Sequence, residues 1–215
     1  MPFEPPDLLG GDLVRTRNHL PHWRLDRATY FVTFRLADSV PQVQLRLWRE
    51  ERESWLQAHG IGPDKPLDSL AEAERHAYHR RFTIRFHEWL DAGEGECWLR
   101  RPECAEVVAG ALRHFDGQRY VLDAFVVMPN HSHALVTPQK GWELSAVLHS
   151  WKSFSAHEIN RRLNRRGILW QKESYDHIVR SEEQFAHYRR YLHQNPVKAR
   201  LRPGEYVWWD ALGEP

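Results

Sequence analysis

Two runs of β-forming residues are separated by only two residues, and this short connection constrains the fold more than any other feature. The runs are Tyr120–Met128 and His131–Thr137, joined by Pro129-Asn130. Strands joined so closely lie side by side and antiparallel, because a parallel pair needs a crossover of a dozen or more residues. The chain is therefore expected to contain an antiparallel hairpin, on which its other elements pack.

The remaining pattern adds further strands and several helices. Residues 28–36 alternate, with Tyr30, Val32, Phe34 and Leu36 on one face, and are predicted to form a strand. A short strand is expected at 174–179. Apolar residues at helical spacing predict helices at 41–59, 69–91, 102–115, 142–163 and 181–194. This pattern indicates one α+β domain over residues 1–215, with an irregular arm at about 1–22 and a helical insertion at about 41–91.

The composition is that of a soluble globular chain and excludes several other classes. Hydrophobic residues make up 41% and charged residues 27% of the chain, and the mean hydropathy is −0.68. No uncharged apolar run approaches the length of a membrane span, and the first residues lack the features of a secretory signal. The two cysteines, Cys97 and Cys104, cannot form a disulfide framework and make a poor zinc site. We therefore expect a cytoplasmic protein with no membrane partner.

The charge is unevenly distributed along the chain. The 30 Lys and Arg residues nearly balance the 29 Asp and Glu residues, for a net charge of +1. Residues 139–204, however, contain 13 basic and 6 acidic residues, a net of +7. A basic third on a neutral chain indicates a local surface for a polyanion. The alternative is that these residues only solvate helix surfaces, and charge alone favours neither interpretation.

The motif His131-Ser132-His133 lies in the second strand of the expected hairpin. Residues i and i+2 of a strand point to the same face, so the two imidazoles project together at a separation suited to one metal ion. The chain has 14 histidines, and chance pairs are common at that number. Solvated histidines at a sheet edge are the alternative, and the motif alone favours it.

The last predicted helix places a tyrosine beside its buried stripe. Phe185, Tyr188 and Leu192 recur at helical spacing and define that stripe. Tyr191 lies roughly 90° from its centre, and Asn195 follows one turn later on nearly the same side. A tyrosine so placed could act as a nucleophile beside a metal ligand. Helix geometry alone favours a boundary tyrosine that only covers the core.

Four segments of the chain follow one another in a recognisable order. They are VVMPNHSHALVTP, the basic stretch SWKSFSAHEINRR, then LWQKESYDHIV and finally YRRYLHQNPVKARL. Together they resemble the REP-associated tyrosine transposases, which belong to the HUH single-tyrosine transposase superfamily. The stretch HLPHWRLDRATYFVTFRL is also similar to the opening strand of that family. The resemblance covers about 22–40 and 104–204.

The resemblance implies a ferredoxin-like α+β fold with a central antiparallel sheet, and a transposase acting on single-stranded DNA at REP-like hairpins. His131 and His133 match the metal-binding histidine pair, and Asn195 matches a third ligand for a divalent metal, Mg²⁺ or Mn²⁺. Tyr191 matches the nucleophile that forms a 5′-phosphotyrosine intermediate. One departure is Ser132, since the family usually has a large apolar residue there. Its hydroxyl would weaken packing on the opposite sheet face unless it finds a partner.

The DNA-binding surface is expected on the basic third of the chain. Its candidate residues are Lys152, Arg161, Arg162, Arg165, Arg166, Trp170, Arg189, Arg190 and Lys198. The cations would contact phosphates and make binding salt-dependent, and the tryptophan could stack on unpaired bases. Core packing is the alternative for the tryptophan, and it is favoured.

Two other functions fit part of this pattern. A catalytically silent protein on the same fold would bind DNA hairpins as a regulator, but the tyrosine and all three ligand types are present. A metallohydrolase would use the histidines without a tyrosine, but no plausible set of further ligands lies near His131, and Asp123 is eight residues upstream. We expect the protein to act as a monomer or a homodimer.

Overall fold

The computed structural model describes residues 14–17, 21–24, 28–62 and 67–213. The chain divides into two compact units, Met1–Ala37 with Cys97–Pro215, and Asp38–Glu96. Most of the irregular arm predicted at about 1–22 lies outside the described residues. The described part is regular, because β1 (Val14–Arg17) and β2 (Pro21–Arg24) form an antiparallel pair.

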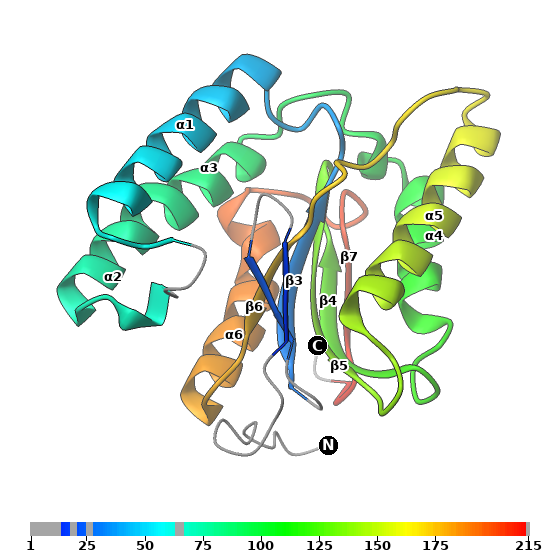
Figure 1. The fold of residues 1–215 in the computed structure, drawn as a ribbon. Coiled ribbons are helices and arrows are strands. Elements are labelled where there is room, and N and C mark those ends of the chain that lie inside the picture. Colours follow the sequence, from blue (N-terminus) through cyan, green and yellow to red (C-terminus); the bar gives the residue numbers. More distant parts are fainter. Residues whose placement is uncertain (1–13, 18–20, 25–27, 63–66, 214–215) are drawn as a thin grey trace. The chain divides into compact units, whose positions relative to one another are not determined.

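The larger unit is built on a five-stranded antiparallel sheet (Figure 1). In spatial order the strands are β6 (Tyr175–Ile178), β3 (Tyr30–Arg35), β5 (His131–Pro138), β4 (Tyr120–Val127) and β7 (Val207–Asp210). The predicted hairpin is confirmed as the pair β4–β5, and Met128 N donates a 2.8 Å hydrogen bond to His131 O across its turn. β7 has no counterpart among the predicted strands, because its four residues are too short for alternation to stand out.

The connectivity of the sheet is ferredoxin-like, as the resemblance implies. In chain order the elements are β3, α4 (Pro102–Arg113), β4, β5, α5 (Leu144–Arg162) and β6. This is a β-α-β-β-α-β arrangement with its first and third strands in the centre, and β7 extends the sheet beyond β4. The predicted α+β fold with a central antiparallel sheet is therefore confirmed.

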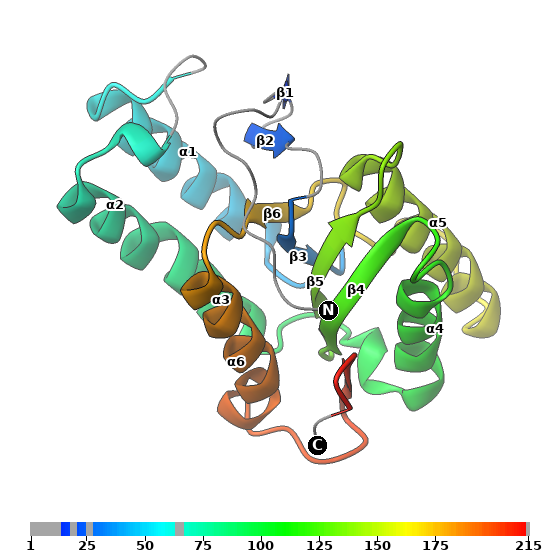
Figure 2. The same cartoon turned by 90° about the horizontal axis from the view of Figure 1, so that it is seen from below.

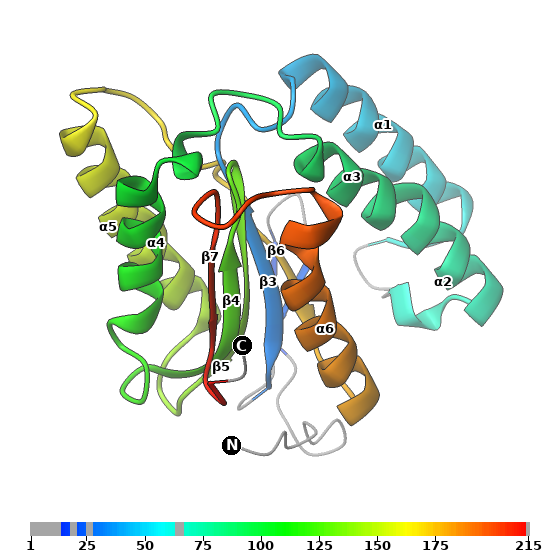
Figure 3. The ribbon, with the colours of Figure 1, turned by 180° about the vertical axis from the view of Figure 1, so that it is seen from behind.

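Helices cover both faces of the sheet. α4 and α5 lie on one face, and α6 (Glu182–Lys198) lies on the other (Figures 2 and 3). Alternation along β3 explains the division, because Val32 and Phe34 pack in the core beneath α4 and α5, whereas Phe31 packs beneath α6. Within the described parts of the chain, no helix combines the length and the apolar character needed to cross a membrane.

α6 extends further at its C-terminal end than the sequence predicts. The expected helix ends at about Gln194, but the observed helix continues with Pro196 inside it. A proline within a helix normally removes one backbone hydrogen bond. Here Pro196 and its neighbour Asn195 are buried, so packing overrides the local rule. The start is as predicted, because Ser181 Oγ accepts a 3.2 Å hydrogen bond from Gln184 N.

The smaller unit, Asp38–Glu96, is helical and has a core of its own. Its helices are α1 (Gln42–Ala58), α2 (Glu72–Tyr78) and α3 (Arg85–Asp91), with a π-helical segment, His79–Ile84, between the last two. Val40, Leu45, Phe86 and Leu90 form the core of this unit. Short 3₁₀ turns lie at Leu67–Ser69 in this unit and at Trp98–Arg100 in the larger one.

A buried hydroxyl joins the sheet to both helices of the α4–α5 face. Tyr120 Oη of β4 donates to Leu112 O of α4 at 2.7 Å and accepts from Trp151 Nε1 of α5 at 2.9 Å. Tyr120 and Trp151 are each 1% exposed, so water cannot replace either bond.

We expect Tyr120→Phe to lower the free energy of unfolding by about 1–3 kcal/mol, because it leaves a buried indole N–H without a partner. Urea unfolding followed by circular dichroism measures the change. Tyr206→Phe is the control, since Tyr206 is only half-buried, and its effect should stay within about 0.5 kcal/mol. Equal stability of the two variants would contradict the role of the Tyr120 hydroxyl.

Candidate active site on the α6 face of the sheet

The two histidines of the motif are buried in the centre of the sheet. His131 and His133 are 1% and 0% exposed, and their ring centroids lie 4.6 Å apart. β5 is a central strand, and its alternation places both rings on the face covered by α6, together with Leu135. The alternative of solvated histidines at a sheet edge is therefore wrong.

Each imidazole is oriented through its Nδ1 atom. His133 Nδ1 lies 2.7 Å from Thr33 Oγ1 on β3, and His131 Nδ1 lies 2.7 Å from Asn130 Oδ1. The amide oxygen of Asn130 can only accept, so His131 carries its proton on Nδ1 in this arrangement. Histidines that bind metals commonly use one ring nitrogen for such a bond and the other for the metal. A metal at this site would therefore be held by the Nε2 atoms.

Ser132 lies between the two histidines and points to the opposite face of the sheet. Its Oγ donates a 3.0 Å hydrogen bond to Val126 O on the neighbouring strand. Ser132 is 0% exposed, so this bond satisfies a hydroxyl at a position suited to a large apolar residue. The serine side chain points away from the two imidazoles and takes no part in orienting them.

α6 sets two tyrosines over the same face. Tyr188 stacks on Phe31 with ring centroids 4.3 Å apart, and burial raises the pKa of Tyr188 to about 12. Tyr191 is half-buried, and its ring meets that of His133 at a steep angle, with centroids 5.4 Å apart. Lys198 Nζ lies 5.7 Å from the centroid of the Tyr191 ring. Of the two tyrosines, Tyr191 is the one whose ring contacts a histidine of the buried pair.

Asn195 follows Tyr191 by one turn of α6. The helix runs antiparallel to β5, because its earlier tyrosine lies over Phe31, the partner of Leu135, and its later tyrosine lies beside His133. Four residues of helix advance by about 6 Å, and two residues of strand by about 6.6 Å. From these rises we expect Asn195 to lie near the level of His131.

The carboxamide of Asn195 is buried without its normal partners. The residue is 0% exposed, and neither Nδ2 nor Oδ1 has a hydrogen bond among the described residues. A buried polar group in this state is costly and indicates an additional partner. A cation would supply that partner for the amide oxygen.

The two imidazoles and the carboxamide of Asn195 are donor types that divalent metal ions accept. No group of three His, Cys, Asp or Glu side chains in the described ranges is arranged to hold a metal. The buried carboxamide of Asn195 is a further candidate donor. Two imidazole nitrogens and one amide oxygen can bind Mn²⁺ or Zn²⁺, and Mg²⁺ when water completes the shell. Because the amide is neutral, a bound ion would keep its positive charge and attract a phosphate.

One cationic residue of this region was not found from the sequence. Arg35 ends β3 and is the direct partner of His131 in the β3–β5 pair. Alternation places it on the face of Thr33, which contacts His133. Arg35 lies outside the basic third of the chain, and only the strand register brings it to the histidines.

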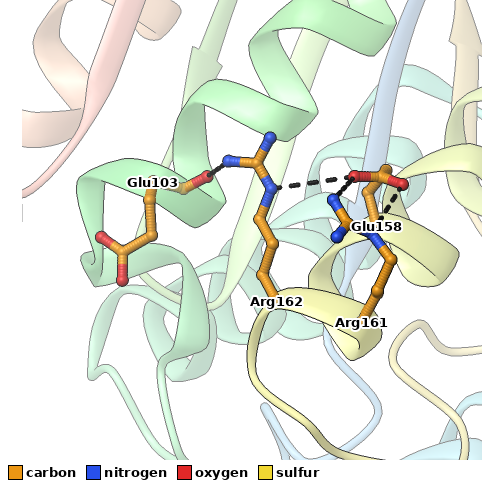
Figure 4. Close-up of polar contacts among 4 residues, drawn as sticks. All are labelled: Glu103, Glu158, Arg161 and Arg162. Carbon is orange, nitrogen blue, oxygen red and sulfur yellow. Dashed lines mark hydrogen bonds and ion pairs between the residues drawn. The ribbon is translucent and has the colours of Figure 1, made fainter.

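Two of the predicted DNA-binding arginines form ion pairs at the end of α5 (Figure 4). Arg161 lies 2.9 Å from a carboxylate oxygen of Glu158, and Arg162 lies 3.8 Å from the same oxygen. Arg162 also donates to Glu103 O at 3.1 Å. The hydrogen bond from Arg161 lowers the pKa of Glu158. Both arginines are exposed, so a phosphate can still reach them.

Two other predicted residues belong to the fold itself. Trp170 is 5% exposed, and its Nε1 donates to Ser155 Oγ at 3.0 Å. Its indole is part of the core and offers no surface for a base, which corrects the prediction. Lys152 Nζ donates to Lys172 O at 2.8 Å and to Ser174 Oγ at 3.3 Å, so its cation ties α5 to the chain that leads into β6.

Some of the remaining predicted cations are held by contacts within the protein, and the others are exposed. Arg189 forms ion pairs with Asp123 and Asp210. Arg165 donates to Asn160 Oδ1 at 2.5 Å and to Ile168 O at 3.3 Å. Arg166, Arg190 and Lys198 are exposed.

The end of α5 returns to the end of the sheet that carries the histidines. Gln171 N donates to Arg35 O at 2.9 Å, and Ala37 N donates to Leu169 O at 2.8 Å. Arg35 is the strand partner of His131, so the segment that follows α5 meets the sheet beside this histidine. The exposed arginines at the end of α5 therefore lie toward the same end of the sheet.

The region around the site matches a known family of sequences. Residues 100–195, which include both histidines, Tyr191 and Asn195, match the family described as IS200-like transposases. None of the curated proteins matches the chain. A solved REP-associated tyrosine transposase bound to a REP hairpin is 16% identical, with a TM-score of 0.42 over 85% of this chain and 74% of that chain. A protein of Deinococcus radiodurans R1 assigned as a transposase is 13% identical, with a TM-score of 0.35 over 80% of this chain and 93% of that one.

The burial of Lys152 has a consequence for the pH dependence of stability. Burial, followed by the charge of Arg35, lowers the pKa of Lys152 to about 8. In the unfolded chain a lysine has a pKa of about 10.4. Between these values the unfolded chain holds a proton that the folded chain has lost, so the free energy of unfolding rises with pH. We expect Lys152→Met to remove this rise.

Urea unfolding at several pH values between about 7 and 10 measures the effect. Lys172→Met is the matched control, because Lys172 is exposed and contributes its backbone carbonyl to the contact with Lys152. This control should keep the rise. A rise that persists unchanged in Lys152→Met would show that Lys152 is solvated.

Proposed function

Because residues 100–195 belong to the IS200-like transposases, we propose that the protein is a transposase that cleaves and rejoins single-stranded DNA through Tyr191. The observation that carries this proposal is the contact between the rings of Tyr191 and His133, whose centroids lie 5.4 Å apart. The same face buries His131, and Asn195 is buried on the helix above it. Attack by a tyrosine beside a metal-bound phosphate requires a constellation of this kind, which supports the proposal.

The reaction would be a transesterification at one phosphodiester. Tyr191 Oη forms a bond to phosphorus, and the bond from phosphorus to the 3′ oxygen breaks. The products are a 5′-phosphotyrosine and a free 3′-OH, so the proton lost by the phenol is balanced by the proton that the 3′ oxygen gains. The phosphodiester bond is exchanged rather than hydrolysed, and a later 3′-OH can rejoin the strand without ATP.

We propose that His131, His133 and the amide oxygen of Asn195 hold Mg²⁺ or Mn²⁺. When bound, this ion would polarise a nonbridging phosphate oxygen and stabilise the charge that develops there. The chain itself orients the two rings through their Nδ1 hydrogen bonds. Lys198 beside Tyr191, and Arg35 opposite His131, add positive charge where a phosphate would bind.

REP-like hairpins are the proposed substrate, on the strength of the four sequence motifs. The exposed Arg161, Arg162 and Arg166 at the end of α5, and Lys198 at the end of α6, would contact the phosphates of such a hairpin. Contacts of this kind make affinity fall steeply with salt. The buried Trp170 has no part in this surface.

We also propose that the smaller unit is an insertion within a single transposase-like domain. It begins after β3 and ends before α4, so the strands on both sides of it belong to the same sheet. All the residues of the proposed site lie in the larger unit.

We expect Tyr191→Phe to abolish the covalent adduct between the protein and DNA, because the attacking oxygen is removed. A labelled single-stranded hairpin incubated with the protein and Mn²⁺ is followed on a denaturing gel, where the adduct migrates slowly. Tyr188→Phe is the matched control on the same helix. It should keep the adduct, since burial raises the pKa of Tyr188 to about 12 and its ring stacks on Phe31.

The same experiment separates the proposed function from its alternatives. Binding by the parent protein without any adduct, across several hairpins, would favour a catalytically silent hairpin-binding regulator. Cleavage that survives in Tyr191→Phe would favour a metallohydrolase that uses the histidines alone.

Tyr191 contacts His133 of its own chain, so we propose that a monomer suffices for cleavage. Tyr191→Phe is mixed with His133→Ala, and adduct formation is measured with the same labelled hairpin. We expect no adduct, because neither variant has a tyrosine and an intact histidine pair in one chain. Recovery of the adduct in the mixture would instead show a homodimer in which the tyrosine of one chain serves the histidines of the other.

A further inference from the structure

Arg189 of α6 reaches two carboxylates near one edge of the sheet. Its guanidinium pairs with Asp210 of β7 and lies 3.5 Å from Asp123 of β4. The side chains of Arg189, Asp123 and Asp210 are 20%, 13% and 6% exposed. An arginine held in this way by two acids is unavailable for a DNA phosphate, although it lies in the basic third of the chain.

An irregularity in β4 brings the two carboxylates together. The register of the β4–β5 pair shifts between Leu122 and Ala124, so Asp123 is an extra residue in its strand. Ala124 then pairs with Asp210, and Ala211 N donates to Asp123 O at 2.9 Å. The position of both acids is therefore built into the sheet.

The charges of this cluster are not arranged for stability alone. Burial raises the pKa of Asp123, Arg189 opposes this effect, and the charge of Asp210 adds to it. Buried ion pairs of this kind contribute little net stability, because the loss of hydration offsets the attraction. These ion pairs instead restrict the position of Arg189, since its guanidinium has to stay between two fixed carboxylates.

Arg189 and Tyr191 lie on opposite flanks of α6. Leu192 is 0% exposed and faces the sheet. At 100° per residue, Arg189 is about 60° to one side of Leu192 and Tyr191 about 100° to the other. Arg189 contacts β4 and β7, while Tyr191 contacts Phe31 of β3 and His133 of β5. A rotation of α6 that moved Tyr191 away from His133 would pull Arg189 from its carboxylates.

We propose that Arg189, Asp210 and Asp123 form a positioning clamp that fixes the rotation of α6 and so holds Tyr191 beside His133. Arg189 is then a positioning residue, which acts through Tyr191 and touches no substrate. The catalytic consequence of the clamp rests on the proposed function, whereas its effect on α6 does not.

The test compares Arg189→Met with Arg113→Met. Arg113 is also an ion-paired arginine, 3.4 Å from Glu106, but it lies on α4 and outside the proposed site. Three quantities are measured for each variant and the parent. They are the hydrogen exchange of residues 185–195, the affinity for a labelled single-stranded hairpin, and the rate of adduct formation with Mn²⁺ at saturating hairpin.

We expect Arg189→Met to speed exchange in α6 and to slow the adduct rate by about 100-fold, since a misplacement of about 1 Å costs that much. Hairpin affinity should be unchanged. Arg113→Met should match the parent in all three quantities. Arg189→Lys keeps the charge and should recover part of the rate, and Asp123→Asn should slow it least, because the pair with Asp210 is retained. These two variants keep the test decisive if Arg189→Met does not fold.

Unchanged exchange in α6 of Arg189→Met would overturn the clamp. Weaker hairpin binding with an unchanged rate at saturation would overturn it as well, because a phosphate contact behaves in that way. Absence of any adduct with the parent would refute the proposed function, and faster exchange in Arg189→Met would then still support the clamp.

Discussion

The pairing of β3 with β5 in a single register is the constraint on which the rest of the site depends. It sets Thr33 opposite His133 and Arg35 opposite His131. Because side chains alternate along a strand, a slip of one residue would turn both histidines toward α4 and α5 and would separate them from Thr33. Apolar residues of the same strands, such as Phe31 beneath α6, hold the register in place. The packing of the core and the orientation of the imidazoles are therefore fixed by the same pairing.

The two faces of the sheet differ in whether their buried polar groups have hydrogen-bond partners. Beneath α4 and α5, the hydroxyl of Tyr120 and the indole of Trp151 satisfy each other within the protein. Beneath α6, aromatic rings surround the histidines, and the amide of Asn195 has no hydrogen bond from the described residues. A face that had only to be stable would satisfy every buried polar atom. The exception is the amide of Asn195, which lies within the segment that matches the family and on the same helix as Tyr191. An unsatisfied polar group is expected at a site that a ligand completes.

The sequence predicts those features whose signal is periodic. The hairpin, the common face of the two histidines and the position of Tyr191 beside the buried stripe follow from repeats of 2 and 3.6 residues. Contacts between distant segments have no such signal, so neither the approach of Arg35 nor the bulge at Asp123 could be predicted. The number of basic residues in a segment predicts the binding residues even less well. Their place in a basic segment predicts that Lys152 and Trp170 bind DNA. Only the structure shows that the contacts of Lys152 and the burial of Trp170 stabilise the fold.

The ends of α5 and α6 explain why the number of cations overstates the attraction of this chain for a polyanion. Each helix C-terminus carries about half a negative charge from its aligned peptide dipoles. α5 ends with Arg161 and Arg162, and α6 ends with Lys198. These cations first offset the field of their own helices, and Glu158 offsets part of the charge on α5. The attraction for a phosphate then depends on the cations that remain, such as Arg166, and on any metal ion bound between the histidines. A net charge of +7 over residues 139–204 is thus compatible with a binding surface that is small and confined to one end of the sheet.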